Sequence, residues 1–274
     1  RARGHERVRP SRRRGLLAAS RRQAHRLGPR RLSAHGRDRR RVGQQNEPSR
    51  KRLQRLYHEK VCDYTAPHFA RSALLIIDVQ NDFIDGAMPV AGTQRLLARL
   101  AELAGGFRAA GRPIAHVIRL YQPGSSDVDA IRRASIEAGA GVVAPGSPGA
   151  DIPAILLPGH RGITLDPDRL LRGQPQQLSA REAVVYKPRW SAFYRTGLET
   201  WLHSHEVDTV VVAGCNLPNC PRATLFDASE RDLRAVLVTD TVSQSTPERL
   251  ADFRLIGVNL LTAEQVVAAL MAEA

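Results

Sequence analysis

The sequence predicts an α/β fold: a six-stranded parallel sheet with helices on both faces, in three layers. From Ser72 onward, short runs of apolar and β-branched residues alternate with longer segments of helical periodicity. These runs are apolar throughout, which is typical of parallel strands that are buried on both faces. The runs span residues 73–79, 114–120, 183–186, 209–213, 235–238 and 258–261.

Helical periodicity fills most of the intervals between these runs. The segment that begins at Thr93, a residue suited to an N-cap, places four leucines on one helical face. These leucines are Leu96, Leu97, Leu100 and Leu103. Similar patterns predict further helices over 197–207, 247–256 and 263–271, and Pro221 opens another.

The stretch 122–180 is rich in Pro and Gly and contains only one weaker helical pattern, at 127–138. A connection of this length is usually functional, and a lid or a binding loop is the expected role.

The positive charge of the chain belongs to its first 60 residues. The whole chain carries a formal charge of +14. Residues 1–60 hold 21 Lys/Arg against 4 Asp/Glu (+17), so residues 61–274 hold 20 against 23 (−3). The basic segment has too few apolar residues to build a core, and we expect it to be disordered. The expected organisation is therefore a basic tail over 1–60 and one folded domain over 61–274.

Three interpretations of the tail compete: a nucleic-acid-binding arm, an organellar targeting peptide, or no function. An Arg- and Ser-rich segment poor in acidic residues fits a transit peptide. However, the chain does not begin with Met, and the composition resembles translated GC-rich sequence upstream of a start. We favour this last interpretation.

The chain contains three cysteines, Cys62, Cys215 and Cys220. An odd number without regular spacing argues against a disulfide framework and fits a reducing compartment. No apolar stretch reaches the length of a membrane span. We therefore expect a cytoplasmic protein without a membrane partner.

Three chemically reactive residues lie at or just beyond the ends of predicted strands. Asp78 ends the first run, Lys187 follows the third, and Cys220 lies shortly beyond the fourth, directly before Pro221. In open parallel sheets, ligands bind outside the carboxyl ends of the strands. An acid, a base and a thiol at that edge predict nucleophilic catalysis by cysteine.

The predicted roles follow from local chemistry. A buried Asp78 and a buried Lys187 each need a partner, so we expect them to pair, with Asp78 accepting the thiol proton. A helix N-terminus and Lys187 favour thiolate, so the pKa of Cys220 is expected below the reference of about 8.5 despite Asp78. Cys215 directly follows a strand and is expected to be buried and inert.

The turn 214–220 leads into a helix and can supply an oxyanion hole. Its expected donors are the backbone amides of Cys220 and Asn216. Phe83, Trp190 and Arg119 lie close in sequence to strand ends and are expected to line a substrate pocket.

No metal or cofactor is predicted. The sequence has no CxxC pair, no HExxH, no Asp/His cluster at ligand spacing, and no glycine-rich phosphate loop. His116, inside a predicted strand, is interpreted as a packed residue.

Together these motifs resemble the isochorismatase-like cysteine hydrolase superfamily, which includes nicotinamidases, N-carbamoylsarcosine amidohydrolase, ureidoacrylate and biuret hydrolases, and isochorismatase. The similarity covers about 72–262 and rests on segments 75–83, 187–198 and 214–220. By this resemblance Cys220 is the nucleophile, Asp78 the proton-transferring group and Lys187 the residue that orients them. It also implies a six-stranded sheet, a cis peptide at Cys215–Asn216, and a dimer or tetramer.

Departures from the family pattern bear on the substrate. The region after the second strand, 119–124, has no histidine, which argues against a nicotinamidase with a pocket metal. Leu217-Pro218-Asn219 replaces the common Thr-Asn or Thr-Asp pair, which indicates a divergent branch. The presence of Cys220 favours hydrolysis of an amide, imide or ureide.

Two rival functions remain open. One is isochorismatase-type vinyl-ether hydrolysis by Asp78 and Lys187, with Cys220 a bystander. The other is nucleic-acid binding through the tail, although a nucleic-acid partner is not expected for the domain, which is mildly acidic.

Overall fold

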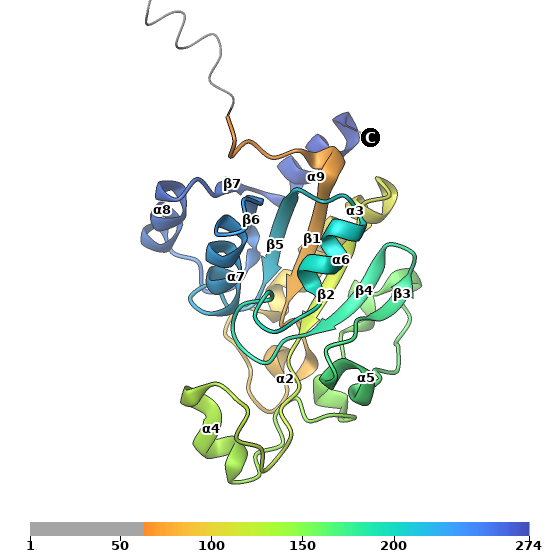
Figure 1. The fold of residues 1–274 in the computed structure, drawn as a ribbon, viewed down its shortest axis with the longest axis vertical. Helices are drawn as coiled ribbons and strands as arrows, with labels where there is room; N and C mark the ends of the chain where they lie inside the picture. Colours follow the sequence, from red (N-terminus) through yellow and green to blue (C-terminus); the bar gives the residue numbers. More distant parts are fainter. Residues whose placement is uncertain (1–62, 274) are drawn as a thin grey trace, which may run out of the picture. The chain divides into compact units, whose positions relative to one another are not determined.

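A computed structural model of the chain describes residues 63–273. The basic tail predicted at 1–60 and Cys62 lie outside the described residues. In the described part, one mixed sheet lies between two layers of helices (Figure 1). Its strands are β1 (Ser72–Ile77), β2 (Ile114–Ile118), β3 (Gln176–Ser179), β4 (Glu182–Tyr186), β5 (Thr209–Gly214), β6 (Arg234–Val242) and β7 (Asn259–Leu261).

The sheet has seven strands, in the order β3-β4-β2-β1-β5-β6-β7, so the predicted number of six was wrong. The six predicted strands are all present and parallel to one another. The added strand is β3, which pairs antiparallel with β4 at the edge of the sheet. The three-layer α/β fold itself is confirmed.

The helices that the periodicity predicts are also present, together with two short helices that it did not predict, over 81–84 and 167–171. The α-helices are α2 (Asn81–Ile84), α3 (Leu97–Ala109), α4 (Ala130–Glu137), α5 (Pro167–Leu171), α6 (Leu198–Ser204), α7 (Cys220–Ser229), α8 (Pro247–Leu255) and α9 (Ala263–Ala272). The predicted N-cap at Thr93 was wrong, because a 3-10 turn over Gln94–Leu96 precedes α3 and the Thr93 side chain caps nothing. Thr93 is instead buried, with its hydroxyl 3.5 Å from that of Ser243.

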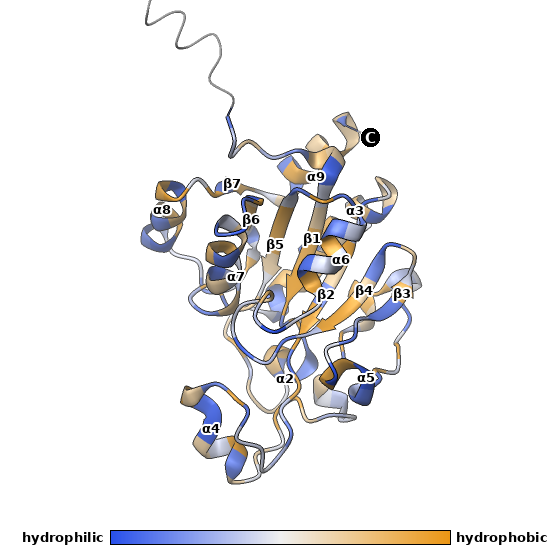
Figure 2. Ribbon diagram, in the orientation of Figure 1, coloured by the Kyte–Doolittle hydropathy of each residue, from blue (hydrophilic) through white to orange (hydrophobic). Residues whose placement is uncertain are grey.

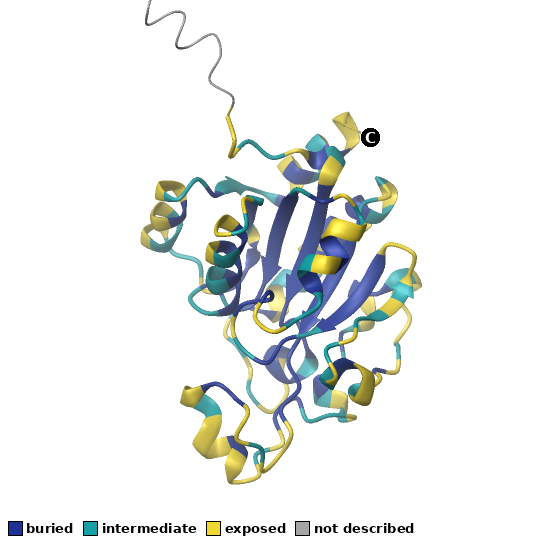
Figure 3. Ribbon diagram, in the orientation of Figure 1, coloured by how far each residue is buried: buried dark blue, intermediate teal, exposed yellow. Residues whose placement is uncertain are grey.

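Each face of the sheet has its own apolar core. Successive residues of β1, such as Leu74 and Leu75, point to opposite faces and belong to different clusters. Helices α3 and α9 cover one face, and α6, α7 and α8 cover the other. Figures 2 and 3 show the consequence: the central strands are the most apolar and most completely buried part of the fold.

The segments beyond the carboxyl ends of the parallel strands are less regular. Helices α2, α4 and α5 lie there, and α4 is carried on an extended, largely exposed arm (Figures 1 and 3). This arm belongs to the long connection 119–175, which also contains three 3-10 turns. Among the described residues, no helix is both long enough and apolar enough to cross a membrane.

Candidate active site

Strand register brings two of the predicted catalytic residues, Asp78 and Lys187, to one edge of the sheet. Asp78 and Lys187 each continue the β-ladder by one residue beyond their strand. The backbone N–H of Asp78 donates to the Val117 carbonyl at 2.8 Å, and that of Lys187 donates to the Ile118 carbonyl at 3.0 Å. Because Val117 and Ile118 are neighbours at the end of β2, the two side chains emerge on either side of the same strand.

These two side chains form a buried ion pair. Lys187 Nζ lies 2.8 Å from Asp78 Oδ2, and the two side chains are 0% and 6% exposed. Asp78 Oδ1 is also buried and has no hydrogen-bond partner among residues 63–273. One carboxylate oxygen is therefore occupied by the lysine, and the other is free to accept a proton.

The turn after β5 requires a glycine at its start. Gly214 has a φ of +113°, and a Cβ there would lie 2.2 Å from the Ile77 carbonyl oxygen. This close approach lets β5 run tightly against β1 before the chain turns toward α7. The peptide bond between Cys215 and Asn216 is cis, as the family resemblance implies.

Cys220 is the first residue of α7, with Asn219 in the N-cap position. Its side chain is 7% exposed and lines the same pocket as Asp78. Neither its backbone N–H nor that of Asn216 donates a hydrogen bond to another group in the described part of the chain. The Asn216 side chain points to Gln244, with Nδ2 3.1 Å from Oε1.

The predicted lowering of the pKa of Cys220 was wrong. Burial raises the pKa of this thiol, and the negative charge of Asp78 raises it further. Lys187 and Arg119 act in the opposite direction but do not outweigh these effects. Sequence reasoning gave the helix N-terminus too much weight and missed the cost of a thiolate in a nearly closed site. At rest, the thiol is therefore protonated.

Cys215 is buried, as predicted. Its Sγ lies 2.9 Å from the backbone carbonyl of Asp78, and burial holds its pKa well above the ordinary value. The Cys215 thiol is therefore a packed group that links the end of β5 to the end of β1.

Arg119 lies deeper in the site than its sequence position indicated. It is 2% exposed, and its Nη1 lies 2.8 Å from Asp129 Oδ2. Tyr121 donates its hydroxyl to the same carboxylate oxygen at 3.0 Å. Nη2 of Arg119 lies 3.6 Å from Cys220 Sγ.

The pocket formed by these residues has a volume of about 100 Å³. All three residues predicted to line it, Phe83, Trp190 and Arg119, do so. Six further lining residues were not predicted: Val90, Tyr121, Ile131, Arg132, Cys215 and Asn219. Ile131 and Arg132 belong to α4, whose helical pattern was visible, but nothing in the sequence indicated that this helix reaches the pocket.

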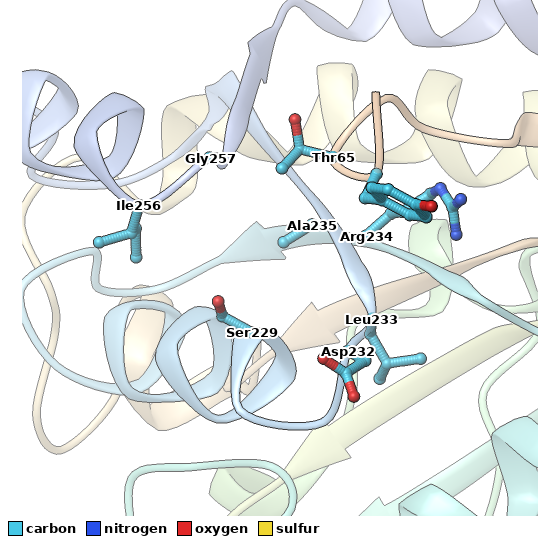
Figure 4. A pocket seen from close by; sticks show the side chains of 9 residues that line it. Thr65, Ser229, Asp232, Leu233, Arg234, Ala235, Ile256 and Gly257 are labelled. Atoms are coloured by element: carbon cyan, nitrogen blue, oxygen red, sulfur yellow. The ribbon is translucent and has the colours of Figure 1, made fainter. Parts of the chain in front are cut away.

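A larger pocket, of about 350 Å³, lies near the amino-terminal end of β6 (Figure 4). Its walls include Thr65, Ser229, Asp232 and Arg234. It has no cysteine or lysine among its lining residues and lies away from the carboxyl edge that carries Asp78. We therefore place the candidate active site in the smaller pocket.

The described residues contain no group of three His, Cys, Asp or Glu side chains arranged to hold a metal ion. His116 is packed inside the sheet, with Nε2 2.7 Å from Glu182 Oε1. Asp82 accepts hydrogen bonds from the backbone of Ala87 and Val143, so it organises the loops beside the pocket.

Comparison with known proteins identifies the family. The chain matches the model of the isochorismatase domain over residues 72–269. This chain belongs to the isochorismatase family.

Individual relatives lie at moderate distance. A probable inactive nicotinamidase of Arabidopsis thaliana is 30% identical over 72% of this chain and 95% of its own length. The ureidoacrylate amidohydrolase RutB of Methylobacterium radiotolerans is 29% identical, over 66% of this chain and 70% of its own. The crystal structure of an isochorismatase family protein from Desulfovibrio vulgaris has a TM-score of 0.61 and 31% identity, covering 73% of this chain and 98% of that one.

Proposed function

We propose that this protein is a cysteine hydrolase that cleaves a C–N bond in a small amide, imide or ureide, without a cofactor. The observation that supports this most strongly is the Lys187–Asp78 ion pair, which opens onto the pocket containing the Cys220 thiol. A free carboxylate oxygen, a thiol and two unpaired backbone amides are the groups that acyl transfer needs. The ureidoacrylate amidohydrolase among the relatives acts on a bond of this type.

In the first half of the proposed reaction, Asp78 removes the proton from Cys220. The thiolate attacks the substrate carbonyl carbon, and the negative oxygen of the tetrahedral intermediate accepts hydrogen bonds from the backbone amides of Asn216 and Cys220. When the C–N bond breaks, Asp78 returns its proton to the departing nitrogen. Ammonia or an amine leaves, and a thioester remains on Cys220.

In the second half, water hydrolyses the thioester. Asp78 takes a proton from the water, and the resulting hydroxyl attacks the thioester carbonyl. Breaking the C–S bond releases a carboxylic or carbamic acid, and the proton on Asp78 returns to sulfur. Lys187 holds the carboxylate in place throughout, since it contacts one oxygen and leaves the other free.

The pocket also indicates the kind of substrate. Its volume of about 100 Å³ favours a small substrate. Arg132 lies at the wall, and its guanidinium is within contact of the Met88 thioether rather than of an acidic side chain. A half-buried cation beside a small pocket favours amides or ureides that carry a carboxylate at their far end.

A substrate panel tests this function. Ammonia release would be measured with carboxylated ureides and amides, with their uncharged counterparts, and with nicotinamide. We expect the carboxylated compounds to be turned over fastest and Cys220→Ala to abolish release. Hydrolysis of a vinyl ether that survives in Cys220→Ala would instead establish the isochorismatase-type alternative.

A further inference from the structure

Arg119 occupies an unusual position for a guanidinium: it is the largest fully buried side chain in the described part of the protein. Burial opposes its charge, but the negative charges around it, Asp78 and Asp129 among them, outweigh this and raise the pKa of Arg119. It therefore stays charged. A charge that costs so much to bury needs an explanation in the chemistry of the site.

The backbone of Arg119 is clamped on both sides by one side chain. Gln80 Oε1 accepts from the Arg119 N–H at 2.8 Å, while Gln80 Nε2 donates to the Arg119 carbonyl at 2.8 Å. Nε2 also donates to the carbonyl of Ala150 at 2.8 Å, which fixes Gln80 to a neighbouring loop. Gln80 is 0% exposed, so water does not compete for these bonds.

The guanidinium is held as firmly as the backbone. Its two terminal nitrogens lie 2.8 Å and 3.4 Å from the two oxygens of Asp129, a forked arrangement that fixes the plane of the group. Tyr121 donates to one of these oxygens and so holds Asp129 in turn. With its plane fixed, Nη2 of Arg119 is directed at Cys220 Sγ, 3.6 Å away.

The arrangement has two fixed cations beside the two groups that exchange a proton. Lys187 lies 2.8 Å from the Asp78 carboxylate, and Arg119 lies 3.6 Å from the Cys220 sulfur. When the proton moves from sulfur to Asp78, the negative charge moves from beside Lys187 to beside Arg119. The S–H bond breaks, an O–H bond forms on Asp78, and the total charge of the site is unchanged.

We propose that Arg119 is a catalytic residue that stabilises the negative charge of the Cys220 thiolate when it forms. Gln80 and Asp129 are the residues that position it. This proposal rests on the proposed function and deepens it. In this proposal Arg119 acts on the sulfur of the nucleophile, and other groups bind the far end of the substrate. It also explains why a buried thiol that is protonated at rest can still be used as a nucleophile.

The test follows alkylation of Cys220 by iodoacetamide against pH, with peptide mapping to separate Cys220 from the other thiols. Iodoacetamide is neutral and needs no substrate, so the result is independent of whether the proposed hydrolysis is found. Removing Arg119 alone would leave the buried Asp129 carboxylate without its cation and with only the Tyr121 hydroxyl as a partner. The informative variant is therefore Arg119→Gln with Asp129→Asn, which removes both charges and keeps two side chains that can hydrogen-bond to each other.

The matched control is Arg132→Gln. It removes a cation that lines the same pocket and leaves in place Arg119, the cation next to the Cys220 sulfur. We expect the midpoint of alkylation to rise by about one pH unit in the Arg119/Asp129 variant, a tenfold loss of rate near neutral pH. In Arg132→Gln we expect a much smaller change. Arg119→Lys, which keeps the charge but loses the fork, should lie between the double variant and the unaltered protein.

Three results would overturn the proposal. One is a folded Arg119/Asp129 variant, with its melting temperature preserved, whose midpoint does not move. Another is an equal rise in Arg132→Gln, because the effect would then come from the general charge of the pocket. The third is failure of both Arg119 variants to fold, which would assign Arg119 to the architecture alone.

Discussion

At the scale of single residues, the Asp78 carboxylate depends on one partner. Lys187→Met removes the ammonium that lies 2.8 Å from it and leaves a buried carboxylate uncompensated. We expect a loss of about 3–5 kcal/mol in the free energy of unfolding and no detectable turnover. Urea denaturation monitored by circular dichroism measures the stability, and ammonia release measures the activity.

The matched control is the double variant Asp78→Asn with Lys187→Met, in which neither charge remains. Its stability should recover most of the loss, while its activity should stay absent because the proton acceptor is gone. Equal instability of the single and double variants would show that the ion pair is not the origin of the effect.

A second residue-scale prediction concerns the thiol of Cys220. Because burial and Asp78 raise its pKa, the thiolate fraction at neutral pH is lower than that of an ordinary thiol. Alkylation by iodoacetamide should therefore rise with pH, with a midpoint above the reference of about 8.5. The same cysteine in urea-unfolded protein provides the reference, and a midpoint below it would restore the original sequence-based expectation.

At the scale of elements, the contact between β1 and β5 depends on the absence of a side chain at Gly214. Gly214→Ala would place a methyl group 2.2 Å from the Ile77 carbonyl oxygen, at a backbone φ of +113°. The backbone must move, and we expect a loss of stability of several kcal/mol together with loss of activity. Gly105 is the matched control, because it lies exposed in α3 with nothing within 4 Å of an added Cβ.

Gly105→Ala should stabilise the protein by about 0.5–1 kcal/mol, since alanine favours the helix. Thermal unfolding of the two variants side by side checks both expectations. A Gly214→Ala protein as stable as the Gly105→Ala protein would contradict the close approach of the two strands.

Sequence patterns identified the strands that have long apolar runs. They missed the strand β3, which has none, and the short helices α2 and α5. The six predicted strands are present because each is apolar enough to be buried. The pattern did not predict β3, because this strand has only four residues, two of them glutamine, and lies at the edge of the sheet. Its existence depends on β4 offering a free edge, which only the folded sheet reveals.

The same limit applies to the site. The strand-end positions of Asp78 and Lys187 were predictable, because parallel strands end at one edge and buried charges need partners. The ion pair of Arg119 with Asp129 was not predictable. The segment that joins them is irregular, and its sequence has no periodic pattern from which its path could be derived. The pKa of Cys220 could not be derived either, because it depends on how completely the pocket closes.

At the scale of the whole molecule, the described domain carries its own core on both faces of the sheet. Residues 1–60 have a composition that cannot add to a core, so a protein beginning at residue 61 should keep its melting temperature and activity. Loss of several degrees on truncation would contradict this, since 1 kcal/mol corresponds to roughly 2–4 °C for a domain of this size. The full-length protein measured in the same buffer is the control.

The assembly of the protein stays a prediction. The family resemblance implies a dimer or tetramer, and large apolar side chains are exposed at the mouth of the pocket. Ile131 is 80% exposed and Trp190 is 40% exposed. Light scattering after size exclusion measures the state directly, and a monomer at micromolar concentration would contradict the expectation.

The central claim is that Cys220 forms a covalent acyl-enzyme during C–N bond cleavage. The most direct measurement is the intact mass of the protein, quenched in acid during turnover of the best substrate of the panel, followed by peptide mapping. We predict an adduct equal to the substrate less its departing amine, on the peptide that contains Cys220 and absent from Cys220→Ala. Turnover that continues in Cys220→Ala, with no adduct on the unaltered protein, would contradict the claim.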